Sequence, residues 1–306
     1  MAKVLVATEK PFASVAVDGI RSVIEDAGYE LELLEKYTSK DELLKAVEDA
    51  DALIVRSDKV DSVVLEAGKK LRIVVRAGAG YDNLDLDECT RHGVIAENTP
   101  GQNSNAVAEL VFGMAVMSAR NMYAGTSGFE LKGKRLGIQA FGQVGRNVAR
   151  IAKGFGMKVE AIDPYCPDKV MEDAGVAPEH SLEQLYSTND FVSIHIPATP
   201  ETVGSIGYDL IASMPKNGVL INTARKEVID ETGLKDALAN RPDIKYVADV
   251  KPDTAVELEE RFPGQVFFTP KKMGAQTAEA NINAGIAAAK QVVDFLKDGV
   301  VRFKVN

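Results

Sequence analysis

The chain has 306 residues, of which 45% are hydrophobic and 26% charged, the balance of an ordinary soluble globular protein. At this length two domains of roughly 150 residues each are expected. The net charge of −9 argues against nucleic acid and anionic membrane surfaces as partners, so an anionic substrate would need a local cationic pocket.

Two cysteines, Cys89 and Cys166, lack the spacing of a metal site, so we expect free thiols in a reducing compartment. The chain starts MAKVLVATEK, which predicts a strand rather than a signal peptide, and no apolar run reaches the ~20 residues that span a bilayer. We therefore expect a cytoplasmic protein without a bound metal.

Apolar runs alternate with amphipathic helical patterns along the chain. The runs VLVA, LELL, ALIV, RIVV and VIAEN occur between Val4 and Asn98, and a mostly apolar helical pattern covers 104–123. A second series contains LGIQ, DFVSIHIP, GVLINTA, YVADV and VFFT. This alternation predicts a parallel doubly wound sheet, and it runs twice. The pattern over 104–123 predicts a crossover helix, with Asn103 or Ser104 as its N-cap.

A dinucleotide-binding fingerprint, LGIQAFGQVGRNVARIAKGFGMKVEAID, runs from Leu136 to Asp163. LGIQ predicts a buried strand, Gly142 and Gly145 let the backbone approach a pyrophosphate, and the next helix directs its N-terminus at the phosphates. Asp163 follows the second strand, where a carboxylate accepts the ribose hydroxyls of NAD and repels the extra phosphate of NADP. NAD is therefore the predicted cofactor.

The first position of this fingerprint is unusual, because Ala140 stands where G-x-G-x-x-G has its first glycine. A methyl group is tolerable there if the turn residue keeps φ below zero, and the remaining pattern of strand, turn, helix, strand and acid is intact. The alternative is an ordinary turn in which Gly142 and Gly145 only cap and pack. The position of Asp163 favours dinucleotide binding over that alternative.

The end of the chain predicts a discontinuous first domain. A last helical pattern covers 278–297, and a strand-like tail at 300–305 is expected to return to the first domain. We therefore predict an α/β fold with two doubly wound parallel-sheet domains and a ligand-binding cleft between them. The domains are a flavodoxin-like substrate domain over 1–97 plus 281–306 and a Rossmann nucleotide domain over 98–280.

Polar residues follow four of the predicted strands, at the strand ends where open α/β sheets bind ligands. The segments are LIVRSDKV with Arg56 and Ser57, VVRAGAGYDNLD with Arg76, LINTARKEVIDE with Arg225, and FFTPKKMGAQTAEA with Lys271 and Lys272.

The motifs VRS, RAGAGYDNLD, NTPGQNS, the fingerprint, HIPATPET, NTAR, VIDE, ADV and GAQTAEA occur in the order found in D-2-hydroxyacid dehydrogenases. The chain resembles this family over nearly its whole length, and it looks most like short members that oxidise 3-phospho-D-glycerate and lack a regulatory domain. The resemblance implies hydride transfer to NAD from a small anionic substrate. It also implies a homodimer formed through the nucleotide domain, with the helix over 104–123.

The resemblance assigns the substrate-binding groups. The backbone of Gly78, Ala79 and Gly80 and the guanidinium of Arg225 would bind the substrate carboxylate, and Arg225 would also contact the reacting oxygen. A bidentate guanidinium suits this role because it orients a 2-oxo acid and stabilises charge on its oxygen.

For a phosphorylated substrate, the resemblance places Arg56 and Arg76 near the distal phosphate, with Ser57 in the same motif. In the alternative interpretation these arginines are strand-end cations paired with a neighbouring acid, such as Asp58 or Asp82.

Cofactor contacts are also implied by the resemblance. They involve Asn103, Ser104, Gly142, Gln143, Val144, Gly145, Asp163, His195, Pro197, Thr202, Thr223, Ala224, Asp249, Gly274 and Ala275. Asp249 would contact the nicotinamide amide and His195 would lie beside the cofactor. The alternatives are that Asp249 only caps a strand end and that Asn103 or Ser104 only caps a helix.

The sequence departs from the family at the proton relay. Most members have a histidine in TPH-x-G, whereas this chain has TPKKMG. Alignment forward from Thr269 puts Lys271 in the histidine's place, and alignment backward from Gly274 puts Lys272 there. We favour Lys272. The alternative is that both lysines form a solvated surface pair in an inactive or purely binding relative.

The glutamate that holds this histidine in the family is also missing, because its position falls on Thr254, with Asp253 one residue early. Lys226 and Glu227 replace the two glycines that usually follow NTAR. A lysine starts with a pKa of about 10.4 and needs a lower one to act as a base near neutrality. Burial and the cation Arg225 would lower it and a glutamate would oppose this, so the two losses fit one change.

Our main hypothesis is NAD-dependent oxidation of 3-phospho-D-glycerate to 3-phosphohydroxypyruvate, the entry to serine synthesis, with a lysine as proton relay. A glyoxylate or hydroxypyruvate reductase is the first alternative, and it would not need both Arg56 and Arg76. An NAD-responsive interaction protein, similar to the C-terminal binding protein corepressors, is an alternative of another class.

Overall fold

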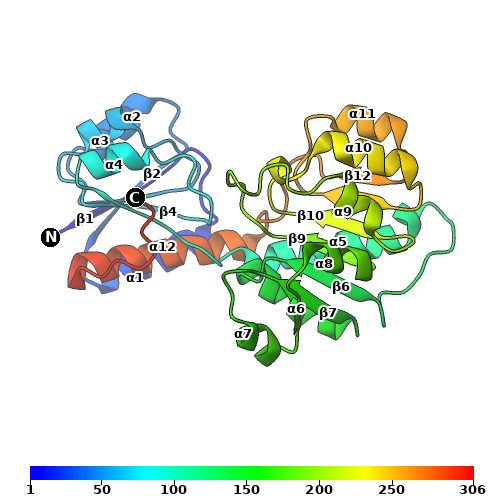
Figure 1. The fold of residues 1–306 in the computed structure, drawn as a ribbon. Helices are drawn as coiled ribbons and strands as arrows, with labels where there is room; N and C mark the ends of the chain where they lie inside the picture. The colour runs from blue at the N-terminus through cyan, green and yellow to red at the C-terminus, as the bar shows by residue number, and fades with distance from the viewer. The chain divides into compact units, whose positions relative to one another are not determined.

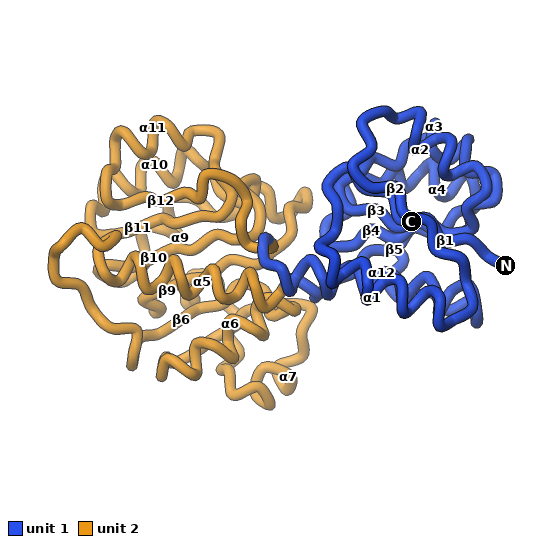
Figure 2. The backbone as a smooth tube through the Cα atoms, turned by 180° about the vertical axis from the view of Figure 1, so that it is seen from behind, with its two compact units in different colours: residues 1–103, 276–306 blue, residues 104–275 orange.

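The computed structural model describes residues 1–306, which form two compact units (Figure 1, Figure 2). Unit 1 contains 1–103 and 276–306, and unit 2 contains 104–275. Each unit is a parallel sheet with helices on both faces, which confirms the predicted α/β class. The division between substrate and cofactor binding stays a prediction. None of the helices combines the length and hydrophobicity needed to cross a membrane.

Unit 1 contains a five-stranded sheet in the order β2-β1-β3-β4-β5, with every pair parallel. The strands are β1 (Lys3–Thr8), β2 (Glu30–Glu35), β3 (Ala52–Val55), β4 (Ile73–Arg76) and β5 (Ile95–Asn98). This is the flavodoxin-like strand order. The interior strands β1 and β3 contain the continuous apolar runs VLVA and ALIV because both faces of the sheet are covered there, whereas the edge strand β2 reads ELELLE and stays partly exposed.

Helices cover the two faces of this sheet in two groups. One face packs against α1 (Ser14–Asp26) and α12 (Ala278–Asp298), and the other packs against α2 (Lys40–Val47), α3 (Ser62–Ala67) and α4 (Leu86–Arg91). Helix α12 begins after its N-cap Thr277, whose hydroxyl accepts a hydrogen bond from the Ala280 amide at 3.1 Å. Because α12 is continuous, the sequence-based boundary at 280/281 falls inside this helix.

The chain end returns to unit 1 along β5, but it does not form the strand-like tail expected over 300–305. Only one antiparallel bridge, between Glu97 and Lys304, is present. The buried Glu97 carboxylate instead accepts the Arg302 amide at 2.7 Å, and the Val305 amide donates to Ala96. Because the Arg302 amide donates to a side chain, it does not pair with the backbone of β5, and the chain end does not add a strand to the sheet.

Unit 2 contains a seven-stranded sheet in the order β12-β11-β10-β9-β6-β7-β8, again with every pair parallel. The strands are β6 (Arg135–Gln139), β7 (Lys158–Ile162), β8 (Ala177–Pro178), β9 (Phe191–Ile194), β10 (Val219–Asn222), β11 (Lys245–Ala248) and β12 (Val266–Phe268). The order reverses between β6 and β9, as in Rossmann sheets, where ligands bind beyond the carboxyl ends of the strands.

Two groups of helices cover this second sheet. One core contains α5 (Ser104–Ala119), α6 (Gln143–Gly154) and α7 (Asp168–Asp173). The other contains α8 (Leu182–Thr188), α9 (Tyr208–Ser213), α10 (Glu231–Asn240) and α11 (Ala255–Arg261). Short single turns lie at η1 (Asn121–Tyr123) and η2 (Lys226–Val228).

Helix α5 is shorter than the pattern over 104–123 predicts, because it ends at Ala119. Asn121, Met122 and Tyr123 have φ values of 50°, 53° and 57°, which cannot continue a right-handed helix. The Nζ of Lys245, on β11, donates to the Ser118 carbonyl at 2.7 Å and so satisfies one of the helix's terminal carbonyls.

Candidate active site

The turn between β6 and α6 is built to leave space at the N-terminus of the helix. Gly142 is the N-cap of α6, no side chain caps the helix, and no acidic residue lies in its first turn. A β-carbon on Gly142 would meet nothing within 4 Å, whereas one on Gly145 would lie 2.3 Å from the Ala140 carbonyl oxygen. Gly145 is therefore needed for packing, and Gly142 leaves a cradle in which a pyrophosphate fits.

Ala140 does not have the conformation that we expect from its side chain. Its φ is +79°, in the left-handed region, and its amide donates to the Ile162 carbonyl at 2.8 Å. The condition for a tolerable methyl group, a negative φ, is therefore not met. The turn imposes the left-handed conformation regardless of the residue that occupies it, and a β-carbon there costs about 1–2 kcal/mol.

Asp163 lies just after β7, beside the glycine turn. Its carboxylate accepts the Phe141 amide at 2.8 Å and the Tyr165 amide at 2.9 Å, one on each oxygen. Each carboxylate oxygen can accept a second hydrogen bond, so both remain able to accept from ribose hydroxyls. Two fixed bonds orient this side chain in advance.

His195 follows β9 and lies between two hydroxyl side chains. Its Nε2 is 2.9 Å from Ser193 Oγ, and its Nδ1 is 3.5 Å from Thr223 Oγ1, just past the end of β10. Burial lowers the pKa of His195 to about 3, so the imidazole is neutral near neutral pH. The Thr202 hydroxyl donates to the Pro197 carbonyl at 2.6 Å and holds the loop that follows.

Arg225 stands on a turn that a buried asparagine holds in place. Asn222, at the end of β10, donates from Nδ2 to the Arg225 carbonyl and accepts the Ala224 amide on Oδ1, both at 2.9 Å. Sequence reasoning missed Asn222. The signal was a polar residue at the end of the apolar run GVLIN.

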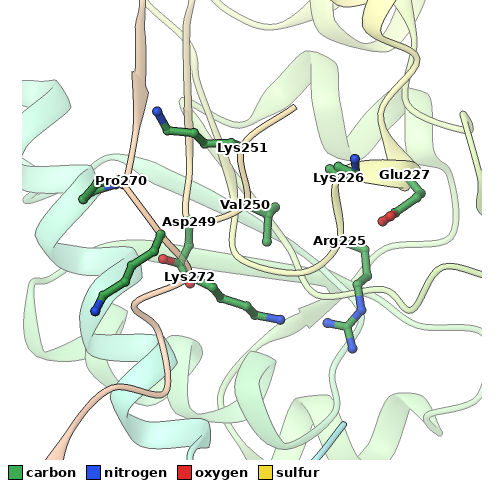
Figure 3. Close-up of a pocket in the computed structure, with 9 residues that line it drawn as sticks. Arg225, Lys226, Glu227, Asp249, Val250, Lys251, Pro270 and Lys272 are labelled. Carbon is green, nitrogen blue, oxygen red and sulfur yellow. The ribbon is translucent and has the colours of Figure 1, made fainter. Parts of the chain in front are cut away.

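Unit 2 contains a cavity of about 330 Å³ at the ends of β10, β11 and β12 (Figure 3). Its lining residues are Arg225, Lys226, Glu227, Asp249, Val250, Lys251, Pro270, Lys271 and Lys272. Figure 3 shows the Lys272 side chain extending across the cavity toward the guanidinium of Arg225. Five of these nine residues are cationic, so the acidic chain has the local cationic pocket that an anionic substrate needs.

Of two acids at this cavity, Asp249 lines it and Asp253 contacts the lining residue Lys226. Lys226 forms an ion pair with the exposed Asp253 at 2.5 Å. Asp249 is buried and binds the segment between Thr269 and Gly274, which carries both candidate lysines. Ala275 follows this segment as the last residue of unit 2.

The candidate phosphate-binding arginines belong to unit 1. Arg56 donates from Nη1 to the carbonyls of Lys10 and Pro11, at 2.8 and 2.9 Å, and from Nη2 to Asn281 Oδ1 at 2.7 Å. Arg76 donates from Nε to the Arg56 carbonyl at 2.9 Å. Burial lowers the pKa of both guanidinium groups. The two side chains differ in their hydrogen bonds. The Nη groups of Arg56 donate to protein acceptors, whereas those of Arg76 do not.

Neither arginine forms the predicted alternative ion pair with Asp58 or Asp82. Asp58 accepts the Tyr37 hydroxyl at 2.8 Å instead. The glycine-rich segment follows β4, and a β-carbon on Gly78 would lie 1.5 Å from Arg76 Nη1, so a larger residue there would displace this guanidinium.

The remaining residues of this segment and its neighbours are placed as follows. Asn98 Nδ2 donates to the Ala79 carbonyl at 2.6 Å, and Gly80 and the exposed Ser57 lie on the adjoining loops. Asn103 is the last residue of the first segment of unit 1, and Ser104 begins α5. Asn103 therefore directly precedes the first helical residue, and its role as the N-cap of α5 stays a prediction.

Comparison with known proteins gives a consistent result. Residues 105–270 match the D-isomer specific 2-hydroxyacid dehydrogenase, NAD binding domain. The chain is 36% identical over 250 residues to D-3-phosphoglycerate dehydrogenase of Methanocaldococcus jannaschii, covering 76% of this chain and 47% of that protein. It therefore spans about half the length of this relative. It is 33% identical over 247 residues to glyoxylate reductase of Thermococcus litoralis, covering 74% of each.

A solved structure is similar over the full length. The crystal structure of NAD+-bound 3-phosphoglycerate dehydrogenase in Entamoeba histolytica has a TM-score of 0.86 and 46% sequence identity, and the match covers 100% of this chain and 98% of that one.

Proposed function

Because the chain belongs to the D-isomer specific 2-hydroxyacid dehydrogenase family, we propose that it oxidises 3-phospho-D-glycerate to 3-phosphohydroxypyruvate with NAD. The observation that carries this proposal is the joint lining of one cavity by Arg225 and the lysine pair Lys271 and Lys272. A carboxylate-binding guanidinium and a proton-transferring amine are the two groups that a 2-hydroxy acid requires.

The residues of the cavity divide the chemistry between them. A bound NAD supplies the hydride acceptor. Arg225 binds the substrate carboxylate and stabilises negative charge on the reacting oxygen. In the oxidative direction the neutral amine of Lys272 accepts the proton of the 2-hydroxyl as the carbonyl bond forms, and in the reverse direction the ammonium returns it. Lys271 is the other candidate for this step.

The distal phosphate of the substrate would bind to unit 1, near the glycine-rich segment that follows β4. Arg76 is the candidate for direct contact, because its two Nη groups donate to no protein acceptor. Arg56 is held by Lys10, Pro11 and Asn281 and places the carbonyl that orients Arg76. A planar guanidinium with free Nη groups matches two phosphate oxygens.

Reduction of glyoxylate or hydroxypyruvate is the second candidate function, which the similarity to the Thermococcus litoralis glyoxylate reductase favours. A substrate without phosphate would not use Arg76.

We also propose a cytoplasmic homodimer formed through α5, in which Leu110 and Met117 keep partial exposure. Light scattering after size exclusion tests the dimer.

A substrate panel tests the proposed function. Purified protein with NAD and 3-phospho-D-glycerate should produce NADH absorbance at 340 nm, fastest at alkaline pH, where a lysine base is neutral. Activity confined to glyoxylate or hydroxypyruvate with NADH would favour the second candidate. NAD binding without turnover of any 2-hydroxy acid would instead favour the interaction protein.

A further inference from the structure

The two charged groups that the proposed reaction needs lie on separate loops. Arg225 follows β10, and the lysine pair follows β12. Strand β11 lies between β10 and β12 in the sheet, and Asp249 is the first residue after it. Asp249 is therefore placed to control the spacing between the two loops.

The Asp249 carboxylate closes the lysine loop at both ends. It accepts the Thr269 hydroxyl on Oδ1 at 2.9 Å, where the loop begins. It also accepts the Met273 amide on Oδ1 at 2.6 Å and the Gly274 amide on Oδ2 at 2.8 Å, where the loop ends. Lys271 and Lys272 lie between these attachment points, so this one side chain fixes the base of the loop that carries them.

Burial makes this attachment strong. Asp249 is 1% exposed. A buried carboxylate is very unfavourable without hydrogen-bond donors, and Asp249 has three. Hydrogen bonds to a carboxylate are stronger than those between neutral groups. Gly274 packs closely against the same group, since a β-carbon there would lie 3.0 Å from Asp249 Oδ2 and 3.2 Å from Val107.

The backbone of Asp249 links the lysine loop to the arginine turn. Its amide donates to the Asn222 carbonyl at 3.0 Å. The Asn222 side chain in turn holds the Arg225 carbonyl and the Ala224 amide. A short chain of hydrogen bonds therefore runs from the arginine turn through Asn222 and Asp249 to the lysine loop.

We propose that Asp249 is a positioning residue for proton transfer, because its carboxylate holds the lysine loop at a fixed distance from Arg225. This inference rests on the proposed function, since it assumes that a lysine of this loop carries the proton. It differs from a contact with the nicotinamide amide, which would act on cofactor affinity. A small misplacement of a relay group can lower a rate by orders of magnitude.

Hydrogen exchange tests the attachment without any activity. Asp249→Asn replaces one acceptor oxygen by an NH2 group, which would face an amide donor at Met273 or Gly274. The backbone amides of Met273 and Gly274 should then exchange about tenfold faster or more, with the rest of unit 2 unchanged. The matched control is Asp236→Asn, at an exposed position of α10. Unchanged exchange at both amides would overturn the proposal.

Kinetics test the positioning role. Asp249→Asn should lower kcat about tenfold or more while the KM for NAD stays within about twofold. Thr269→Val removes one donor and leaves Asp249 intact, so it should lower kcat about threefold, and Thr269→Ser should behave like the native protein. A raised KM for NAD with native kcat, together with a native-like Thr269→Val variant, would contradict the proposal.

The two proposals fail in different ways. If the native protein does not oxidise 3-phospho-D-glycerate, the proposed function fails while the exchange result still decides whether Asp249 holds the loop. If the native protein turns over and Asp249→Asn loosens the loop without lowering kcat, only the positioning role fails.

Discussion

Gly145 leaves no room for a side chain beside Ala140, because a β-carbon at position 145 would lie 2.3 Å from the Ala140 carbonyl oxygen. Gly145→Ala should therefore lower the free energy of unfolding by roughly 1–3 kcal/mol, because helix α6 must shift away from β6. Thermal or denaturant unfolding measures this loss. A variant with native stability would show that the helix moves freely.

Gly142 should respond in the opposite way. Nothing lies within 4 Å of a β-carbon there, and its φ of −74° suits any residue. Gly142→Ala should keep native stability but weaken NAD binding about tenfold, because the methyl fills the cradle at the helix N-terminus. Calorimetric titration with NAD measures the affinity. Native affinity would place the pyrophosphate elsewhere.

Ala140 offers a stabilising substitution. Its φ of +79° is unfavourable for alanine and free for glycine. Ala140→Gly should raise the free energy of unfolding by up to about 1 kcal/mol, since relief of strain exceeds the entropy that glycine adds to the unfolded chain. Chemical denaturation checks this. A destabilised variant would mean that the methyl group packs favourably enough to offset its strain.

Part of the molecule could be predicted from the sequence, because the relevant physics is local. Continuous apolar runs indicate strands covered on both faces, and the fingerprint indicates the turn that begins α6. The left-handed conformation of Ala140 could not be predicted, because residue type alone favours a negative φ and the turn imposes the opposite. Strand β8, with two residues, is too short to give any pattern.

Other features depend on contacts between distant residues. Asp249 is visible in the sequence as a strand-end acid, but its bonds to Thr269 and Gly274 follow from the order of strands in the sheet. The Ser118 carbonyl, near the end of α5, likewise accepts a hydrogen bond from Lys245, which lies on β11. Single-sequence patterns carry no information on such pairs.

His195 makes stability depend on pH. Its pKa is about 3 in the folded chain and about 6.5 when unfolded, so only the unfolded state takes up a proton between these values. The contribution is complete above pH 6.5 and is lost as the pH falls toward 3. At pH 5 the loss of this contribution should lower the free energy of unfolding by about 1–2 kcal/mol.

His195→Gln isolates this effect. The fall in unfolding free energy between pH 7 and pH 5 should be smaller in the variant than in the native chain by about 1–2 kcal/mol. Equal falls in both proteins would show that His195 is protonated in the folded state.

Substitutions of the two unit 1 arginines, Arg56 and Arg76, should change different measured properties of the protein. Arg76→Ala should raise the KM for 3-phospho-D-glycerate about tenfold or more and leave glyoxylate reduction within about twofold, because only the phosphate loses a partner. Arg56→Ala should instead lower stability by roughly 1–3 kcal/mol, since it removes three hydrogen bonds within unit 1. Similar effects of Arg76→Ala on both substrates would contradict a phosphate site.

The lysine pair is resolved by single substitutions. Lys272→Ala should lower kcat for oxidation about 100-fold or more, whereas Lys271→Ala should keep a rate within about threefold of native. Steady-state kinetics with NAD at one alkaline pH makes the comparison. The reverse ranking would identify Lys271 as the relay.

The central claim, that a lysine replaces a histidine in oxidising 3-phospho-D-glycerate, is tested most directly by the pH dependence of kcat/KM. With NAD in excess, kcat/KM should rise between about pH 7 and about pH 10 as the amine loses its proton, and Lys272→Ala should abolish this rise. Absence of turnover at every pH, or a pH-independent rate that Lys272→Ala retains, would contradict the claim.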